Sequence, residues 1–441
     1  MLKILAGTAV PIDLTLALAT FLSLAGISWK NRIFGAEEWF HRLRVTSLAR
    51  AQRPDQVTDI GNNIFKIIKT SNIKKFGRYI GSSMEEDEMI TVIGATGFTG
   101  TLIAQLLDKE QVPLRLTGRD RAKLDALGSS LSSNAEKIVL DVTDLSGLKT
   151  AIAGSDVVIN CAGPFTTFGL KVAETVINAG VSYLDITGEQ QYIAQVIERF
   201  NALAIKNECT AIPSCAFEYA MVDTAAAMMH QQLGGLTSIE ATYFIEGMYT
   251  SRGTKRSIIC ALESPSFQLR NGTLTKIPGG ESSPFPVDKN KTVQRFPFPG
   301  GEVYLLPLHI PIKNISTFLT AEASPAVLGL VSKIMPMIAR TPLRKLIDLA
   351  IDHSDPVPKR TETKFKIFCK GSNANGTSSS TVEISGADPY YLTAKIVSQC
   401  AIALTKPGVP RGVISASMLS GFQFIQSITE AESVFWKQET L

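Results

Sequence analysis

One short stretch, residues 90–100, constrains the fold of this chain more than any other. It reads Ile-Thr-Val-Ile-Gly-Ala-Thr-Gly-Phe-Thr-Gly, and a helix-spaced apolar pattern follows it over 101–107. An apolar β-branched run that enters glycines spaced G-x-x-G-x-x-G and then a helix is typical of a dinucleotide-binding βαβ unit. The free N–H groups at the start of such a helix attract phosphate. The residues predicted to hold the cofactor here are Gly94, Thr96, Gly97, Phe98, Thr99 and Gly100.

The end of the second expected strand, 112–119, favours NADP over NAD. A protein that binds NAD places Asp or Glu at this position, where the carboxylate holds the ribose hydroxyls. This strand ends in Gly118-Arg119 instead, and a guanidinium group suits a 2′-phosphate. Two other readings stay open, because Asp120 is compatible with NAD and Arg119 can be an ordinary solvated surface charge.

Strand and helix patterns alternate with a period of 20–30 residues as far as about residue 213. Such alternation predicts a Rossmann-type, doubly wound parallel sheet. Because ligands of open α/β sheets bind at the carboxyl edge, residues that follow the strands become candidates. Asp141 follows the third strand, and Ala162, Gly163 and Pro164 follow the fourth. Asp144 is expected to cap the helix 145–152. Further strands are expected at 137–141, 156–160, 182–186 and 209–213, and further helices at 121–131, 169–179 and 191–206.

The pattern changes after His230, where short strand candidates separated by glycine and proline turns replace the βα alternation. They indicate an inserted α+β domain with a mixed, mostly antiparallel sheet, which would build the substrate cleft. The expected domains are 88–220 for the dinucleotide, 221–385 for the insert and 386–441 for a helical return. The expected strands of the insert are 238–245, 293–298, 303–308, 315–319, 363–369 and 379–384.

Two stretches are compatible with contact to lipid. Residues 1–83 carry 12 Lys and Arg against 5 Asp and Glu, and their segment 14–29 is almost continuously apolar. This extension has three readings. It is a membrane anchor, a hydrophobic helix packed on a partner or on the domain, or additional sequence that precedes a natural start at Met84. Residues 325–351 combine a helix-spaced apolar stripe with basic residues. This pattern is typical of a hairpin that rests on a membrane surface or covers an acyl ligand, and it also fits a pair of helices packed in the core.

Composition excludes several classes of protein. A net charge of only +4 over 441 residues does not indicate nucleic-acid binding. The 6 cysteines are scattered and only 4 histidines occur, a pattern that predicts neither a metal site nor a disulfide framework and suggests the cytoplasm. Tyr391 and Lys395 match Y-x-x-x-K, the acid–base pair of short-chain dehydrogenases. They lie almost 300 residues after the glycines, so we interpret the match as coincidence.

Several motifs together resemble the saccharopine dehydrogenase-like oxidoreductase family, and within it the branch of the mycobacterial trans-acting enoyl reductases. The resemblance covers about residues 88–430. It implies a Rossmann domain with a mixed-sheet insert and NADP-dependent reduction. The motifs are Gly94–Gly100, Gly118-Arg119, Gly163-Pro164-Phe165 with Gly169, Tyr183–Glu189, Cys215–Tyr219 with Asp223, Ser251–Thr254, Asp388-Pro389-Tyr390 with 392–394, and Gly412-Val413. Ala216 stands where the branch usually has glycine.

The resemblance brings four candidate catalytic residues to the cleft: Glu218, Tyr219, Arg252 and Asp388. Arg252 is suited to a carboxylate or phosphate of the substrate, and Glu218 either donates a proton or caps a helix. We expect an NADP-dependent reductase of a lipid-like or acyl substrate, with a homodimer and contact to a membrane or lipid surface as further expectations. The alternative is a catalytically silent NADP-binding protein that associates with membranes or lipid droplets.

Overall fold

The computed structural model describes residues 88–246, 251–263, 266–277, 281–321, 363–374 and 376–440. The chain separates into two units, Met1–Glu86 and Asp87–Leu441, and the described residues all belong to the second. The apolar segment 14–29 and the amphipathic stretch 325–351 therefore lie outside the described residues. No helix in the described ranges is both long and apolar enough to cross a membrane.

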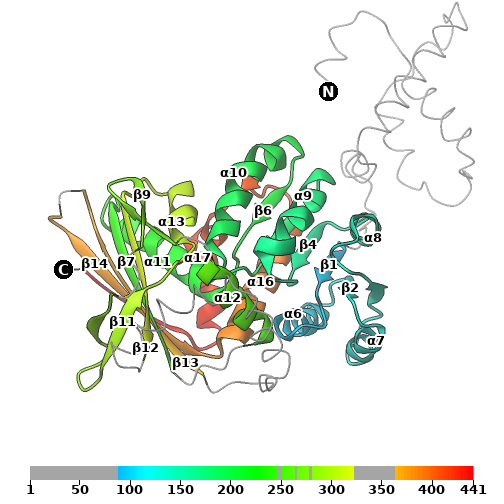
Figure 1. Cartoon of the computed structure of the whole chain (residues 1–441), viewed down its shortest axis with the longest axis horizontal. Coiled ribbons are helices and arrows are strands. Elements are labelled where there is room, and N and C mark those ends of the chain that lie inside the picture. Colours follow the sequence, from blue (N-terminus) through cyan, green and yellow to red (C-terminus); the bar gives the residue numbers. More distant parts are fainter. Residues whose placement is uncertain are drawn as a thin grey trace, which may run out of the picture. The chain divides into compact units, whose positions relative to one another are not determined.

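The first sheet is a seven-stranded parallel sheet that lies on the side of the α8 and α9 helices in Figure 1. Its strand order is β15-β6-β5-β4-β1-β2-β3, the order of a doubly wound dinucleotide fold with one further strand, so the predicted fold class is confirmed. The strands are β1 (Ile90–Ile93), β2 (Leu114–Gly118), β3 (Glu136–Val139), β4 (Val157–Asn160), β5 (Ser182–Asp185), β6 (Thr210–Ile212) and β15 (Gly412–Val413).

Side-chain alternation along the strands divides the helices between the two faces of this sheet. Along β4, Ile159 joins the core beneath one set of helices and Val158 the core beneath the other. Because successive strand residues point to opposite faces, a sheet buried on both sides has continuous apolar strands. One face carries α6 (Phe98–Lys109), α7 (Arg121–Ser129) and α16 (Pro389–Thr405), and the other carries α8 (Leu145–Ala151), α9 (Leu170–Asn178) and α10 (Gln190–Lys206).

The second sheet is mixed, as predicted. Its order is β10-β11-β12-β7-β13-β14-β16, and β8 and β9 extend from β12. Only β7 and β12 pair in parallel among the described strands of this sheet. The strands are β7 (Ser238–Glu246), β8 (Phe267–Arg270), β9 (Thr273–Lys276), β10 (Ser283–Pro286), β11 (Thr292–Pro297), β12 (Asn314–Ala321), β13 (Lys364–Ser372), β14 (Ser379–Ala387) and β16 (Phe435–Thr440).

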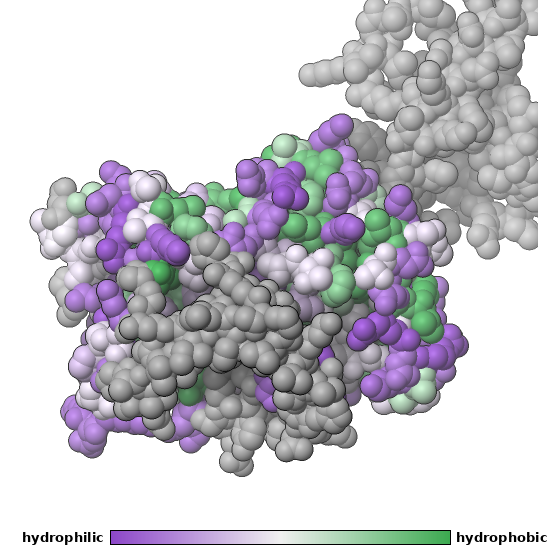
Figure 2. Space-filling model, viewed as in Figure 1, coloured by the Kyte–Doolittle hydropathy of each residue, from purple (hydrophilic) through white to green (hydrophobic). Residues whose placement is uncertain are grey.

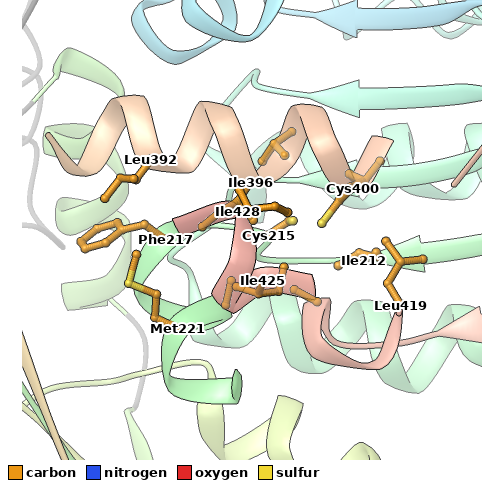
Figure 3. Packing of buried hydrophobic residues seen from close by; sticks show 14 of the residues in the cluster. Ile212, Cys215, Phe217, Met221, Leu392, Ile396, Cys400, Leu419, Ile425 and Ile428 are labelled. Atoms are coloured by element: carbon orange, nitrogen blue, oxygen red, sulfur yellow. The ribbon is translucent and has the colours of Figure 1, made fainter. Parts of the chain in front are cut away.

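One hydrophobic core connects the two sheets. Helices α11 (Phe217–Gln232), α16 and α17 (Phe422–Glu430) meet in it, and Figure 3 shows Phe217, Ile396 and Ile425 converging from these three helices. The inner face of the second sheet, including Ile367 and Ile384, contributes to the same cluster. On the face drawn in Figure 2, outside the atoms in grey, hydrophobic residues are scattered among hydrophilic ones.

One strand prediction was wrong, and several elements were missed. Residues 303–308 form the short helix α13 (Glu302–Leu305) and the 3₁₀ turn η3 (Leu306–Leu308), not a strand. A short apolar run does not distinguish a buried strand from a buried helical turn, and Pro307 removes a backbone donor that a central strand needs. The missed elements are β8, β9, β10, α12 (Arg252–Glu263), the π-helical turn η2 (Phe165–Gly169) and the 3₁₀ turn η4 (Ala416–Met418). The strands β15 and β16 were also missed, and they lie within 386–441, where only a helical return was expected.

We predict that the α16 side of the shared core carries much of the stability. Ile396 is 0% exposed within it, so Ile396→Ala should lower the free energy of unfolding by about 2–5 kcal/mol in urea denaturation, because it leaves a cavity. Ile205→Ala is the matched control, since Ile205 on α10 is 53% exposed and should change stability by less than about 1 kcal/mol. Equal losses for the two variants would contradict this account of the core.

Candidate functional site

The glycine turn between β1 and α6 has the close contacts that the G-x-x-G-x-x-G pattern predicts. Gly94 has φ +74°, and a Cβ there would lie 3.1 Å from the backbone nitrogen of Ala162. A Cβ on Gly100 would overlap the carbonyl oxygen of Gly94 and lie 3.0 Å from Cα of Ala95. The first glycine thus lets the turn touch the segment after β4, and the last lets α6 pack on the turn. No side chain caps the amino end of α6, so its N–H groups are suited to a pyrophosphate.

The residues that follow β2 and β3 are brought together at the carboxyl edge of the sheet. Arg119 is exposed directly after β2, and its charge contributes to lowering the pKa of Asp141, although hydrogen bonds from the backbone and side chain of Thr143 lower it more. Asp120 is the N-cap of α7 and accepts from the backbone N–H of Lys123 at 3.1 Å. The Asp120 carboxylate therefore caps a helix. The Arg119 guanidinium is exposed to solvent, near Asp141 at the same edge of the sheet.

The turn after β4 is held in place by a network of buried hydrogen bonds. The Asn160 side chain accepts from the backbone N–H of Ala162 at 3.0 Å and donates to the Tyr183 hydroxyl at 3.1 Å. Tyr183 and Tyr192 share a hydrogen bond of 2.8 Å between their hydroxyls, and both side chains are 0% exposed. The Gly163–Pro164 peptide that continues the turn is cis. These contacts hold Ala162, Gly163 and Pro164 against the glycine turn.

A buried carboxylate, that of Glu189, holds the start of η2. It accepts from the backbone N–H groups of Phe165 at 2.9 Å and Thr166 at 2.7 Å, and from the Thr166 hydroxyl at 2.6 Å. The Ser257 hydroxyl of α12 donates a fourth hydrogen bond at 2.7 Å. Charge-assisted bonds of this kind are about twice as strong as neutral ones. Glu189 thus ties the segment after β4 to the helix that carries Arg252.

The start of α12 is also joined to the glycine turn. The Tyr390 hydroxyl accepts from the backbone N–H of Ser251 at 2.8 Å and bonds the Thr254 hydroxyl at 2.9 Å. The Tyr390 ring packs edge-to-face on Phe98 with centroids 5.1 Å apart. Arg252, next to Ser251, is exposed at this junction.

Two other predicted residues near α16 have structural contacts. Asp388 precedes the helix with φ +55°, and its carboxylate accepts from the backbone N–H of Tyr391 at 3.2 Å, so it is the N-cap of α16. Lys395 of the Y-x-x-x-K match forms an ion pair with Glu432 at 3.4 Å. That ion pair accords with the interpretation of the match as coincidence.

Glu218 and Tyr219 lie in the first turn of α11, directly after the carboxyl end of β6. Glu218 is partly exposed, and burial raises its pKa to about 7. Tyr219 is 1% exposed, and burial followed by the charges of Glu218 and Glu302 raises the pKa of its phenol. A carboxyl group that still holds its proton near neutral pH is suited to general acid catalysis.

A second buried acid, Glu302, lies beside this pair and was not predicted from the sequence. It is 1% exposed, accepts a hydrogen bond from the Tyr243 hydroxyl, and has its pKa raised to about 7, mainly by burial. Its Oε2 has no hydrogen-bond partner among the described residues. Glu302 follows a Gly-Gly turn in an apolar run, and no sequence signal distinguishes a buried acid of this kind from a surface one.

Gln190 attaches the second sheet at this point. Its amide donates to the carbonyl oxygens of Phe267 at 2.8 Å and Gly300 at 2.7 Å and accepts from the Phe267 N–H at 2.8 Å. These bonds join Gln190 to the start of β8 and to the turn that precedes Glu302. No group of three or more His, Cys, Asp or Glu side chains in the described ranges is arranged to hold a metal ion.

Known proteins are similar to the part of the chain that forms the glycine turn and most of the first sheet. Residues 90–237 match the family model described as the saccharopine dehydrogenase NADP binding domain. A solved structure of saccharopine dehydrogenase (L-Glu forming) from Saccharomyces cerevisiae superposes with a TM-score of 0.55, covering 80% of this chain and 100% of that one, at 14% identity. The first match confirms the predicted family resemblance and the NADP-type domain, and the second supports the fold.

Similar proteins include three named relatives. A saccharopine dehydrogenase-like oxidoreductase of Bos taurus is 28% identical over 232 residues, 47% of this chain and 52% of that protein. A trans-acting enoyl reductase of Mycobacterium ulcerans is 30% identical over 143 residues, 31% and 34% of the two chains. A lipid droplet localized protein of Caenorhabditis elegans is 26% identical over 191 residues, 39% and 44%. The match spans about half the length of the first of these relatives.

We predict that Glu302 lowers stability as pH rises. Its folded-state pKa, about 7, lies above the usual glutamate pKa of 4.5, so the folded protein binds the proton more tightly than the unfolded chain. The contribution of Glu302 is therefore most favourable below pH 4.5 and is lost as pH rises to about 7. Glu302→Gln should be more stable than wild type by up to about 2–3 kcal/mol at pH 8, with no advantage at pH 4, in urea denaturation.

Glu189→Gln is the control for this prediction. Four donors converge on the Glu189 carboxylate, and an amide would turn an N–H₂ group toward some of them, so this variant should be less stable than wild type at pH 8. A Glu302→Gln variant that is destabilised to the same degree at pH 8 would disprove the assigned electrostatic cost.

Proposed function

We propose that this chain, whose residues 90–237 form an NADP-binding domain of the saccharopine dehydrogenase family, is an NADP-dependent oxidoreductase that reduces an acyl or lipid-like substrate. The observation that carries the proposal is the Glu218 carboxyl, partly exposed at the carboxyl edge of the cofactor sheet and able to keep a proton near pH 7. The names of two relatives, an enoyl reductase and a lipid droplet localized protein, favour the substrate class.

The residues present fit a bound NADP. Gly94 and Gly100 leave no room for a Cβ and so keep the turn tight, and the amino end of α6, which no side chain caps, would face the pyrophosphate. Arg119 would hold the 2′-phosphate with a charge-assisted contact, and Asp141 would lie near the adenine. Ala162, Gly163 and Pro164, fixed by Asn160, would line the nicotinamide end.

Bound NADPH supplies a hydride to a polarised double bond. The chain must then place a proton on the other atom of that bond, and we assign this to the Glu218 carboxyl, which becomes a carboxylate as it donates. Tyr219 lies beside it with its hydroxyl 3.5 Å from the carbonyl oxygen of Gly188, which keeps the first turn of α11 near the end of β5. Arg252 would bind a carboxylate or phosphate of the substrate.

Asp388 receives no proton-transfer role in this proposal, since its carboxylate caps α16. A homodimer and binding to a membrane or lipid surface stay predictions. The catalytically silent alternative makes the same cofactor prediction and differs only in the absence of turnover.

Arg119→Ala should weaken NADPH binding and leave NADH binding almost unchanged. Loss of one charge-assisted contact to the 2′-phosphate corresponds to about 1.5–3 kcal/mol, a factor of roughly 10–100 in Kd by fluorescence titration. Arg121→Ala is the matched control, because Arg121 is also exposed but pairs with Asp125 at 3.1 Å. Equal weakening of both cofactors by Arg119→Ala would contradict NADP selection by this side chain.

Oxidation of NADPH with a long-chain trans-2-enoyl thioester of coenzyme A should slow as pH rises above about 7, because Glu218 must be protonated to donate. Glu218→Gln should lower kcat by about 10²–10⁴ and remove this alkaline decline. Glu198→Gln, an exposed carboxylate on α10, should change neither. Wild-type activity in Glu218→Gln would exclude Glu218 as the donor, and NADPH binding without turnover of acyl substrates would favour the silent alternative.

A further inference from the structure

Two sequence motifs, Ser251–Thr254 and Asp388-Pro389-Tyr390, lie against each other although 139 positions separate Ser251 from Tyr390. The first motif begins α12 and the second begins α16. The Tyr390 hydroxyl accepts from the backbone N–H of Ser251 at 2.8 Å and forms a hydrogen bond of 2.9 Å with the Thr254 hydroxyl. One side chain of α16 thus bonds both the backbone and a side chain at the amino end of α12.

The start of α16 holds Tyr390 in a defined position. Asp388 caps the helix through the backbone N–H of Tyr391 at 3.2 Å, and Pro389 occupies the first helical position and is buried. The Tyr390 ring packs edge-to-face on Phe98, with the ring centroids 5.1 Å apart. Phe98 is the first residue of α6 and belongs to the glycine turn. Tyr390 therefore contacts the glycine turn with its ring and α12 with its hydroxyl.

Hydrogen bonds hold the described half of α12 to the elements around the first sheet. Ser251, Thr254 and Ser257 are spaced three apart, so they lie along one face of the helix. Ser257 donates to the Glu189 carboxylate at 2.7 Å, which is a second attachment on this face. Residues 252–257 include no apolar side chain. Because an element held by few apolar contacts opens locally at a low free energy, the position of this half of α12 depends on its hydrogen bonds.

Arg252 belongs to the part of α12 that Tyr390 holds. It follows Ser251 directly, so its side chain is turned by about 100° around the helix axis from the bonded face. The side chain is exposed. The distance between Arg252 and the glycine turn is therefore set by the bonds between the Tyr390 hydroxyl and the first turn of α12. Without these bonds, the amino end of α12 would be free to move away from the carboxyl edge of the first sheet.

We propose that Tyr390 is a positioning residue, whose hydroxyl holds the amino end of α12, and with it Arg252, at a fixed place beside the glycine turn. This inference rests on the proposed function, in which Arg252 binds a carboxylate or phosphate of the substrate. Tyr390 acts on the substrate through α12, so its hydroxyl contributes to substrate binding. Its ring contact with Phe98 belongs to the glycine turn and does not depend on the hydroxyl.

Tyr390→Phe separates the two contacts, because it keeps the ring and removes only the hydroxyl. In the cofactor-free protein, hydrogen exchange resolved to single residues by mass spectrometry should show the Ser251 and Thr254 amides exchanging about tenfold faster than in the wild type. The Kd of NADPH should change by less than about twofold. The KM of a long-chain trans-2-enoyl thioester of coenzyme A should rise by about tenfold with kcat nearly unchanged, as expected when uniform binding is lost.

A matched pair of Thr→Val variants tests the same attachment from the side of α12. Thr254→Val removes the hydroxyl that bonds Tyr390, so it should speed exchange at Ser251 and raise the KM in the same direction. It also serves as the test if Tyr390→Phe does not fold. Thr175→Val removes a hydroxyl that donates to the Lys171 carbonyl oxygen within α9 at 2.7 Å. This control should change neither the exchange at Ser251 nor the KM.

Unchanged exchange at Ser251 in folded Tyr390→Phe would overturn the proposal, and so would a KM that does not rise. A loss of NADPH affinity as large as the rise in KM would also overturn it, because Tyr390 would then support the glycine turn and not the substrate. The proposed function fails in a different way. Faster exchange at Ser251 in Tyr390→Phe, in a protein that neither binds nor reduces the thioester, would leave the positioning of α12 standing and exclude that substrate class.

Discussion

The carboxyl edge of the first sheet, where the cofactor is predicted to bind, depends on one close contact in the turn after β1. Gly100, the last glycine of this turn, packs against the carbonyl oxygen of Gly94, the first. A side chain at Gly100 would occupy the space of that oxygen, and one at Gly94 would reach the backbone of Ala162. Two turns from separate βα units therefore lie against each other with only backbone between them. Because neither can move away without opening the core beneath β1 and β4, the predicted phosphate site and the predicted nicotinamide end are held in one fixed arrangement.

Polar side chains buried behind these turns complete the arrangement. Asn160 supports the segment after β4 through Ala162, and Glu189 gathers four donors from η2 and α12. Gln190, the next residue, reaches the second sheet at Phe267 and Gly300. Adjacent residues at the start of α10 thus attach α12, β8 and the turn at Gly300 to the carboxyl edge of the first sheet, and Glu302 lies beside α11. The helix α13, which lies between β11 and β12 in the chain, thereby brings Glu302 to α11.

The sequence was most informative where local pattern and burial agree. Strands such as Val157–Asn160 are buried on both faces, and their continuous apolar runs alternate with amphipathic helices, so the order of the cofactor domain could be predicted. Asp144 as a helix cap and the helix after Asp388 were confirmed for the same local reason. The π-helical turn after Pro164 was missed, because it depends on Glu189, which is 24 residues away from Phe165 in sequence.

The second sheet was less predictable because its strands are short and pair across long intervals. Residues 303–308 satisfy a strand pattern as well as a helical one, and their conformation follows from the turn at Gly300 and packing against α11. Phe435–Thr440 alternates but pairs with a strand that lies 50 to 60 residues earlier in the register, a pairing no local signal specifies. The acid at Glu302 has the same origin, since its burial and its proximity to Glu218 come from tertiary packing.

The central claim, that Glu218 donates a proton while NADPH supplies a hydride to an acyl double bond, is tested most directly by isotope labelling. The protein is incubated with a long-chain trans-2-enoyl thioester of coenzyme A and with NADPH carrying deuterium at C4, each face of the ring being labelled in turn, and the acyl product is analysed by mass spectrometry. The account predicts one deuterium per reduced chain from one of the two labelled faces, a second hydrogen that comes from solvent, and a strong loss of product in Glu218→Gln. Bound NADPH that retains its deuterium while the acyl chain stays unsaturated would contradict it.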